Sequence, residues 1–408
     1  MTRSIRRRHW LGAAAAAVLT PHAFAQAAPG ARGEGRLVVV FLRGAVDGLS
    51  LLVPYADRDY ARLRPSIALP APDGTGQAAL RLDDTFALHP ALAPLLPMWQ
   101  QRVLAAVPAA GSPDPTRSHF DAQYQWETAR PGATSDAPGW LNTLSALGGA
   151  SHTVHAVGVG EANPRILSGR ESVKLVARGK SAQRAGALDN PRTRDALLAM
   201  YGGDDAMSKA FRQGADSRLQ TAQELQREMQ AADNGAAPPA LLEQDARNLG
   251  TLMRQERALR IGFLSAGGWD THANQGAATG QLASNLRNLA AALVQLRRDF
   301  SQPGDVIVVA SEFGRTAAEN GTRGTDHGHG NAMWLIGQPV AGGRWHGDWS
   351  GLALPNLHEA RDVPVHHDFR AVLAQLLRPM FGLRDSQLAD VLPGARWDTR
   401  LDALVRPA

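Results

Sequence analysis

The stretch RLVVVFLRGAVDG, residues 36–48, decides the fold. Residues 36–42 form a short, apolar, β-branched run, which is typical of a strand buried on both faces in a parallel sheet. A turn with glycines at positions 44 and 48 follows, and it carries Asp47. The pattern predicts a central strand that delivers a carboxylate to the edge of a sheet.

Similar apolar runs recur along the chain, and segments with apolar residues at three- and four-residue spacing lie between several of them. Strands that alternate with helices predict an α/β fold with a largely parallel central sheet flanked by helices. The further predicted strands are residues 103–107, 153–159, 260–265, 305–310 and 332–336. The predicted helices are residues 90–100, 119–129, 281–300 and 366–380, with Asp368 as a plausible cap of the last.

Residues 192–258 differ in composition from the rest of the chain. They are polar and rich in Gln, Arg, Glu and Ala, and the sequence NGAAPP interrupts them at residues 234–239. This pattern indicates two or three surface helices joined by a turn. We therefore expect one domain over residues 36–408, with a helical insertion at about residues 192–258.

The first 25 residues are typical of a twin-arginine export signal. The paired arginines Arg7 and Arg8 precede an apolar run at residues 11–19, and Ala-Phe-Ala at residues 23–25 suggests cleavage before Gln26. An Ala/Pro/Gly linker follows at residues 26–35. The alternatives are an ordinary export signal or an uncleaved anchor, although the run is short for a membrane span. We expect a periplasmic protein that folds before the twin-arginine machinery exports it, with no membrane span in its mature form.

Composition excludes several classes of site. The 408 residues include no cysteine, which excludes disulfides, thiolate metal sites and cysteine nucleophiles. Four arginines and no acid lie within the predicted signal, so the net charge falls from +5 to +1 on its removal. The remaining charges are mixed along the chain, and nucleic-acid binding is not expected.

Acids and histidines follow the predicted strands. Ligand sites of open α/β sheets lie beyond the carboxyl ends of the strands, so these side chains are expected to gather at one edge. Carboxylates and imidazoles are ligands for zinc, manganese and related ions, and an open site fits better than a closed structural one. A solvated polar loop is the alternative. The candidate ligands are Asp47, Asp270, His272, Glu312, Asp326, His327 and His329.

Ser118 is the candidate nucleophile, because it immediately precedes the predicted helix at residues 119–129. A helix N-terminus offers free amide donors and the positive end of a dipole to an anionic group. The alternative is that Ser118 only caps the helix. Arg43, Arg117 and Arg315 are candidates to hold a phosphate or sulfate, or else to pair with neighbouring acids. Most other histidines, including His119, are expected to be buried and hydrogen-bonded.

Long motifs carry a family resemblance. LVVVFLRGAVDGLSLLVPY (37–55), GSPDPTRSHFDAQ (111–123), GWDTHANQ (268–275) and SEFGRTAAENGTRGTDHGHGN (311–331) resemble the exported bacterial family called domain of unknown function 1501. The resemblance extends over nearly the whole mature chain. That family is similar to the alkaline phosphatase and sulfatase superfamily. The resemblance implies an alkaline-phosphatase-like fold, with a site for one or two divalent ions, zinc or manganese, at the carboxyl edge of the sheet.

The superfamily's motif order implies roles for the candidate residues. Ser118 would be the nucleophile, Arg117 or Arg315 would neutralise charge, and the acids and histidines named above would bind metal. Glu312 is followed by Phe313 where many members have histidine, and the last motif has two histidines instead of one. Either His327 or His329 therefore supplies the missing ligand, or a single ion binds.

The resemblance implies a periplasmic, metal-dependent hydrolase of phosphate or sulfate esters. Its substrate would be an anionic ester, either a small molecule or a component of the cell envelope. The alternative is a non-catalytic periplasmic binding or assembly protein that retains the phosphatase-like fold.

Overall fold

The computed structural model describes residues 35–133, 137–147, 155–160, 163–176, 233 and 236–407. The predicted export signal, residues 26–34 of the predicted linker and nearly all of residues 192–235 lie outside the described residues.

Nine of the described strands form one mixed sheet. Its order is β11-β5-β10-β9-β1-β8-β6-β7, with β12 paired to β5. Strand β10 is antiparallel to both of its neighbours, and the other pairs are parallel. The predicted α/β class with a largely parallel sheet is confirmed. The strands are β1 (Leu37–Leu42), β5 (Leu104–Gly111), β6 (Ala156–Val159), β7 (Val173–Val176), β8 (Ile261–Ala266), β9 (Val306–Ala310), β10 (Asn331–Gly337), β11 (Arg344–Trp345) and β12 (His367–Asp368).

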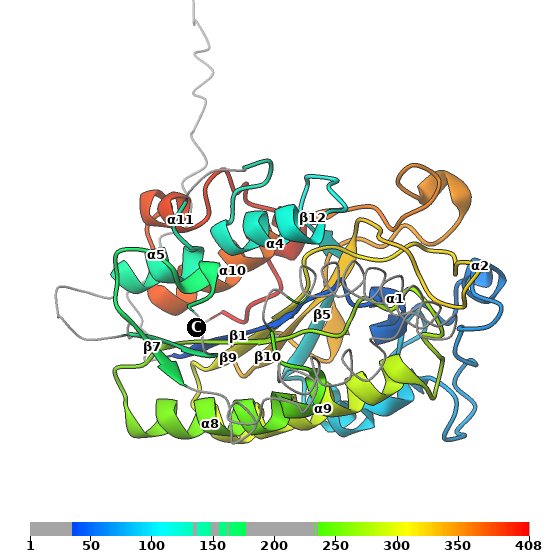
Figure 1. Ribbon diagram of the computed structural model, residues 1–408, viewed down its shortest axis with the longest axis horizontal. Coiled ribbons are helices and arrows are strands. Elements are labelled where there is room, and N and C mark those ends of the chain that lie inside the picture. The colour runs from blue at the N-terminus through cyan, green and yellow to red at the C-terminus, as the bar shows by residue number, and fades with distance from the viewer. Residues whose placement is uncertain are drawn as a thin grey trace, which may run out of the picture.

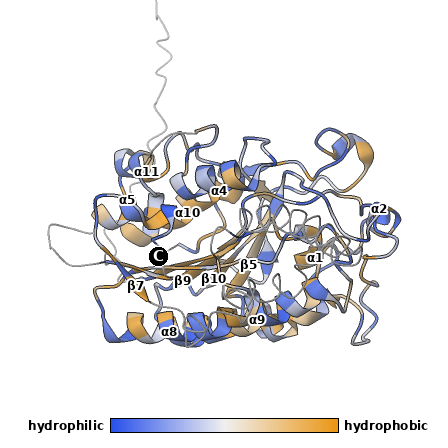
Figure 2. Ribbon diagram, in the orientation of Figure 1, coloured by the Kyte–Doolittle hydropathy of each residue, from blue (hydrophilic) through white to orange (hydrophobic). Residues whose placement is uncertain are grey.

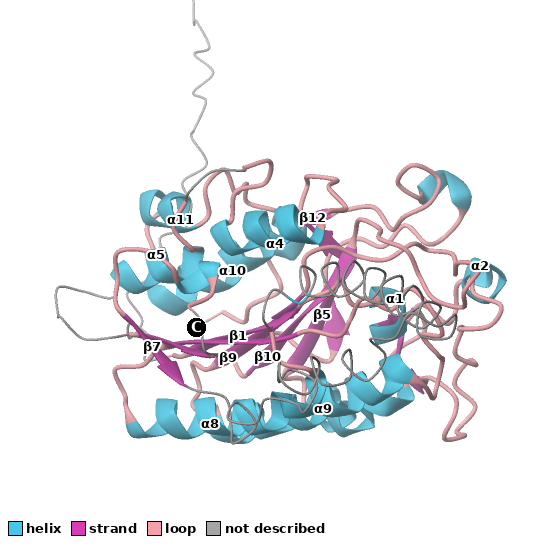
Figure 3. Cartoon of the chain, viewed as in Figure 1, coloured by secondary structure: helices cyan, strands magenta, loops and turns pink. Residues whose placement is uncertain are grey.

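Helices cover both faces of this sheet (Figure 1). Figure 3 shows the strands as a layer between two layers of helix, with long loops beyond one end of the sheet. One face is covered by α4 (His119–Thr128), α5 (Trp140–Ala146), α10 (Phe369–Phe381) and α11 (Asp385–Val391). The other is covered by η1 (Pro90–Leu95), α3 (Leu96–Gln100), α8 (Leu242–Gln255) and α9 (Gln281–Asp299).

Strand β1 shows why the run at residues 36–42 makes a central strand. Its side chains alternate between the faces: Val38, Val40 and Leu42 belong to the apolar core under α8 and α9, and Val39 and Phe41 to the core under α4 and α10. Each of these side chains is at most 1% exposed. Such burial stabilises by about 1.5–3 kcal/mol for each large apolar side chain. Figure 2 shows the same result as hydrophobic strands between helices of mixed polarity.

Helix α8 is the described part of the predicted helical insertion. Its apolar side chains at Leu242, Ala246, Leu249 and Met253 are buried in the core that it shares with α9 and β8. This part of the segment therefore forms one of the layers that cover the sheet, because apolar residues recur at helical spacing within its polar composition.

No helix among the described residues is both long enough and apolar enough to cross a membrane. The remaining described elements are short. A separate three-stranded sheet has the order β2-β4-β3, with β2 at Leu52–Val53, β4 at Ala87–Leu88 and β3 at Leu80–Arg81. The short helices are α1 (Gly48–Leu51), α2 (Arg58–Leu63), η2 (Arg165–Leu167), η4 (Pro239–Leu241), η5 (Leu354–Asn356) and η6 (Thr399–Leu401).

The strand directions bring four chain segments to one edge of the sheet. Strands β1, β8 and β9 end at this edge, and β10 begins there because it is antiparallel to β9. The turn after β1 is tied to the segment after β9, since the amide of Gly44 donates to Glu312 Oε1 at 2.7 Å and that of Val46 to Ser311 Oγ at 3.1 Å. Most of the candidate site residues are therefore collected at this edge.

Candidate metal centre

Three imidazoles and one carboxylate converge at the edge of the sheet. His119 is the first residue of α4, Asp270 and His272 follow β8, and His327 lies between β9 and β10. The Nε2 atom of His327 lies 3.0 Å from the Nε2 atoms of both His119 and His272. Asp270 Oδ1 lies 2.9 Å from the Nε2 of His272, 3.3 Å from that of His327 and 3.5 Å from that of His119. We call these four residues the metal centre.

The other nitrogen of each imidazole, Nδ1, faces a hydrogen-bond acceptor. Because carboxylate and carbonyl oxygens only accept, each Nδ1 is the donor, and a ring in its neutral form therefore presents the lone pair of Nε2 to the metal centre. Three Nε2 atoms and a carboxylate oxygen thus point toward one another. The pairs are His119 with Glu312 Oε1 at 2.9 Å, His272 with Asp326 Oδ1 at 3.2 Å, and His327 with the carbonyl of Arg117 at 2.8 Å.

The metal centre fits one divalent ion. Ligand atoms placed about 2.0–2.2 Å from a tetrahedral ion lie about 3.3 Å from one another. The ligand atoms of His119, Asp270 and His327 are separated by 3.0, 3.3 and 3.5 Å, close to that value. Among the residues that the structure describes, His119, Asp270 and His327 form the group whose ligand atoms all lie within 4.8 Å of one another. Imidazole nitrogens oriented by a second hydrogen bond are typical of ligands held ready for a metal.

Electrostatics at the metal centre favour positive charge. Burial opposes protonation of His119, but hydrogen bonds to Asp270 and Glu312 outweigh it and raise its pKa to about 9. Burial likewise opposes ionisation of Glu312, but the hydrogen bond and charge of His119 lower its pKa to about 2. The pKa of Asp270 lies far below its ordinary value despite burial, because it lies within hydrogen-bond reach of the three imidazoles and beside the charge of Arg315. A proton on His119 thus occupies the place that an ion would take.

Arg315 holds Asp270 in place. Its guanidinium donates to Asp270 Oδ1 at 2.5 Å and to the backbone carbonyls of Gly44, Ala45 and Thr325. The side chain is fully buried. Arg315 was predicted either to hold a phosphate or sulfate or to pair with a neighbouring acid. In the structure its donors serve the carboxylate of Asp270 and the turn after β1.

Asp47 lies apart from the three histidines. Its carboxylate accepts from Arg64 at 2.6 and 3.0 Å, from Ser50 at 2.6 Å and from Gln275 at 2.7 Å. Burial would raise its pKa, but the charge of Arg64 and these hydrogen bonds lower it. The guanidinium of Arg64 therefore supplies the positive charge beside this predicted ligand.

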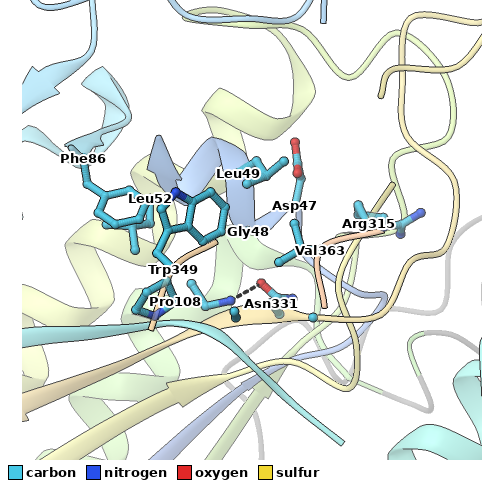
Figure 4. A pocket seen from close by; sticks show the side chains of 13 residues that line it. Asp47, Gly48, Leu49, Leu52, Phe86, Pro108, Arg315, Asn331, Trp349 and Val363 are labelled. Atoms are coloured by element: carbon cyan, nitrogen blue, oxygen red, sulfur yellow. Dashed lines mark hydrogen bonds between the residues drawn. The ribbon is translucent and has the colours of Figure 1, made fainter. Parts of the chain in front are cut away.

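Asp47 and Arg315 also border a small hollow (Figure 4). Its other walls are mostly apolar, and the rings of Phe86 and Trp349 meet edge to face with centroids 5.3 Å apart. The volume is about 20 Å³, which is room for one water molecule and not for a substrate. A substrate would reach the metal centre from the exposed side, where His272 and Asp326 have 43% and 53% of their side chains exposed.

His329 lies outside the group formed by the other histidines. Its Nε2 donates to the carbonyl of Ser112 at 3.0 Å, and its ring lies 4.5 Å from that of His358. Burial and the neighbouring His358 lower its pKa. The structure thus brings His327 to the metal centre, while His329 anchors the loop after β5.

Ser118 and Arg117 immediately precede His119 of the metal centre. Ser118 is exposed and caps α4, with its Oγ accepting from the amide of Asp121 at 3.3 Å. The Arg117 side chain is 31% exposed and pairs with Glu359 at 2.6 Å and Asp362 at 2.7 Å. Both residues therefore lie at the rim, and each already has an internal partner.

His119 is the residue that the sequence analysis set aside. Its position in the sequence could have indicated its role, because His119 begins the helix that follows β5. It therefore lies at the same edge of the sheet as the other candidates. Gln123, four residues on and hence on the same side of α4, donates to Glu312 at 2.9 Å. A histidine and a glutamine at this spacing form the polar side of the helix that faces the strand ends.

Glycines allow the loops around the metal centre to pack closely. A side chain at Gly314 would overlap the carbonyl of Gly330, and one at Gly328 would overlap the backbone of Arg315. One at Gly324 would overlap the backbone of His272. The glycines of the segment after β9 are thus required by close backbone approach.

Residues 34–392 match the family described as "Protein of unknown function (DUF1501)". The chain belongs to this family. The predicted membership is confirmed, and the match includes every member of the metal centre. No curated protein sequence matches the chain.

Several solved structures are similar to the chain in fold. The lipoteichoic acid synthase LtaP from Listeria monocytogenes has a TM-score of 0.39 and 9% identity, over 89% of this chain and 76% of that chain. The alkaline phosphatase from the Antarctic bacterium TAB5 has a TM-score of 0.33 and 10% identity, over 89% and 99%. The protein i-CgsB in complex with k-i-k-neocarrahexaose has a TM-score of 0.39 and 10% identity, over 87% and 73%. Likeness at these levels supports no inference about function.

Proposed function

We propose that the protein is an exported, metal-dependent hydrolase of phosphate or sulfate esters. The observation that carries the proposal is the convergence of three imidazole Nε2 atoms and the Asp270 carboxylate at an edge open to solvent. A closed structural site would surround the ion with protein, whereas the side chain of His272 is 43% exposed. The family resemblance supplies the class of ester.

The chain's own residues position and polarise the metal centre. Glu312 and Asp326 accept from Nδ1 of His119 and His272, which orients the rings, and Arg315 fixes the Asp270 carboxylate. When bound, the ion would act as a Lewis acid on an ester oxygen and lower the pKa of an attacking hydroxyl group. Ser118 lies at the exposed rim to supply that hydroxyl, or water does so in its place.

A single ion is proposed for each chain. Asp47, which the motif order suggests as a metal ligand, is instead neutralised by the buried guanidinium of Arg64. Removing charged groups from water is costly, and an ion pair of this geometry offsets that cost without a metal. Zinc suits three imidazoles and one carboxylate, and manganese is the second choice.

The experiment pairs metal analysis with a panel of phosphate and sulfate monoesters and diesters. We expect the wild type to hold one ion per chain and to turn over at least one ester. His327→Gln should lose most of the ion and at least about 100-fold in turnover, because an oriented ligand is gone. The matched control is His155→Gln, since His155 Nδ1 donates only to the backbone carbonyl of Ala258 in the structure.

Two outcomes would count against the proposal. Full metal content in His327→Gln would place the ion elsewhere. A bound ion with no turnover on any ester would favour the binding or assembly protein that retains the fold.

A further inference from the structure

A second hollow lies at the edge of the sheet opposite the metal centre. Arg102 precedes the start of β5, whereas His119 follows its far end. An eight-residue strand spans about 26 Å, so the two regions are well separated. The hollow has a volume of about 300 Å³ and is lined by Arg102, Ala341, Gly342, Gly343, Arg344 and Arg406. We call it the arginine pocket.

The arginine pocket concentrates positive charge. Its three arginines come from separate parts of the chain, and no lining residue is acidic. Within the described part of the chain, no ion pair links any of the three to a carboxylate. The Arg406 guanidinium also donates to the backbone carbonyl of Arg102 at 2.5 Å, which holds two like charges at one hollow. Like charges repel, and a bound anion would relieve that repulsion.

The backbone of Arg102 shows that its position is specified. Arg102 has φ = 60° and follows α3, where Val103 donates to the Met98 carbonyl at 2.9 Å. Glycine is the usual residue at this left-handed position after a helix, because a side chain is strained there. Such strain is concentrated at ligand sites.

The glycines of the pocket allow its loop to lie close to Arg102. A Cβ atom at Gly343, which has φ = 74°, would lie 2.8 Å from Cγ of Arg102. A Cβ atom at Gly342 would lie 2.6 Å from the amide nitrogen of Leu104. The loop can approach Arg102 this closely only because both positions lack a side chain, so the hollow is built by the backbone.

We propose that the arginine pocket binds a tetrahedral oxyanion, phosphate or sulfate, either free or as part of a lipid headgroup. Guanidinium groups bind such anions through paired N–H donors, and three groups around one hollow suit a doubly charged anion. The site is independent of ester hydrolysis at the metal centre. It gives the protein a second place to hold an anionic molecule.

The test is calorimetric titration of inorganic phosphate and of sulfate at constant ionic strength, with protein purified from the periplasm. The variant Arg102→Gln/Arg344→Gln/Arg406→Gln removes the three charges, and Arg298→Gln, an exposed arginine at the end of α9, is the matched control. We expect the triple variant to lose one binding event, with affinity there at least about tenfold weaker. Its unfolding midpoint and ester turnover should match those of the wild type, because all three side chains are exposed.

A second arm distinguishes the source of the anion. Sedimentation with phosphatidylcholine vesicles, with and without phosphatidylglycerol, tests a lipid headgroup. If the wild type binds free phosphate or sulfate and the triple variant does not, the ligand is a soluble anion. If the triple variant loses only the phosphatidylglycerol-dependent sedimentation, the ligand is a lipid headgroup. Wild-type protein that binds neither probe, or a triple variant that binds as well as the wild type, would overturn the proposal. Failure of ester turnover has no bearing on this result.

Discussion

His119 shows how one residue can be misread from sequence. An isolated histidine before a helix has no pattern that distinguishes a ligand from a buried, hydrogen-bonded side chain. In the structure its two ring nitrogens face Glu312 on one side and His327 on the other. Its protonation in the metal-free protein follows from those neighbours.

The stability of metal-free protein should therefore depend on His119. Its folded-state pKa of about 9 exceeds the ordinary value of 6.5, so its contribution is complete below pH 6.5 and is lost as the pH rises to about 9. We expect the unfolding midpoint of chelator-treated protein to fall by several degrees over that interval. His119→Gln should lack this part of the pH dependence, and an identical profile in the variant would contradict the assignment.

The hydroxyl group of Ser118 has two possible roles, as a nucleophile or as a helix cap. As a nucleophile it is required for turnover, so Ser118→Ala should abolish most ester hydrolysis while the metal content is retained. As a helix cap its loss should lower the free energy of unfolding by about 1 kcal/mol and leave turnover per folded molecule unchanged. Turnover and thermal midpoint measured on one preparation distinguish these results. Unchanged turnover would leave water as the nucleophile.

At the scale of elements, the segment between β9 and β10 contributes most of the residues at and around the metal centre. It supplies Glu312, Arg315, Asp326 and His327 to one edge, because β10 returns antiparallel to β9. Close approach within this segment requires glycine, since a side chain at Gly314 would overlap Gly330.

Gly314→Ala should displace this segment. We expect a loss of about 1–3 kcal/mol in the free energy of unfolding, as for other overpacked positions, together with reduced metal content. Gly321→Ala is the matched control, because a side chain at Gly321 meets nothing within 4 Å. Its stability should change by less than about 0.5 kcal/mol. Equal effects in the two variants would mean that the close packing does not support the metal centre.

Long buried strands could be predicted from sequence, and short or paired elements could not. The apolar run at residues 36–42 specified β1 because both of its faces are buried. The two-residue strands β2, β3 and β4 carry too few side chains for any periodicity. The direction of β10 also leaves no trace in its own sequence, since a strand buried on both faces looks the same in either direction.

The sequence predicted where the candidate site lies better than it predicted which side chains contact one another there. Asp270 and His327 were assigned to a shared ion, and they lie 3.3 Å apart. The pairing of Asp47 with Arg64, seventeen residues further on, follows from a turn geometry that neither side chain reveals. Ligand and supporting residue are the same amino-acid types, so only packing distinguishes them.

At the scale of the whole molecule, export remains a prediction from residues 1–25. Replacing both Arg7 and Arg8 with lysine should leave the precursor in the cytoplasm, because the twin-arginine route reads the arginine pair and not its charge. Fractionation followed by immunoblotting measures this. The control is Arg3→Lys, which lies outside the pair. Normal periplasmic accumulation of the double variant would refute the predicted route.

The sequence distance between the ligands has a consequence for metal supply. His119 and His327 are 208 residues apart, and they meet only when β5, β9 and β10 are assembled in one sheet. The four side chains of the metal centre can therefore come together only after these strands have paired. If the chain folds before export, as predicted, its ion would be chosen from the cytoplasmic pool, where metal availability outweighs intrinsic affinity. The compartment in which the chain folds, and not the one in which it works, would set the identity of its metal.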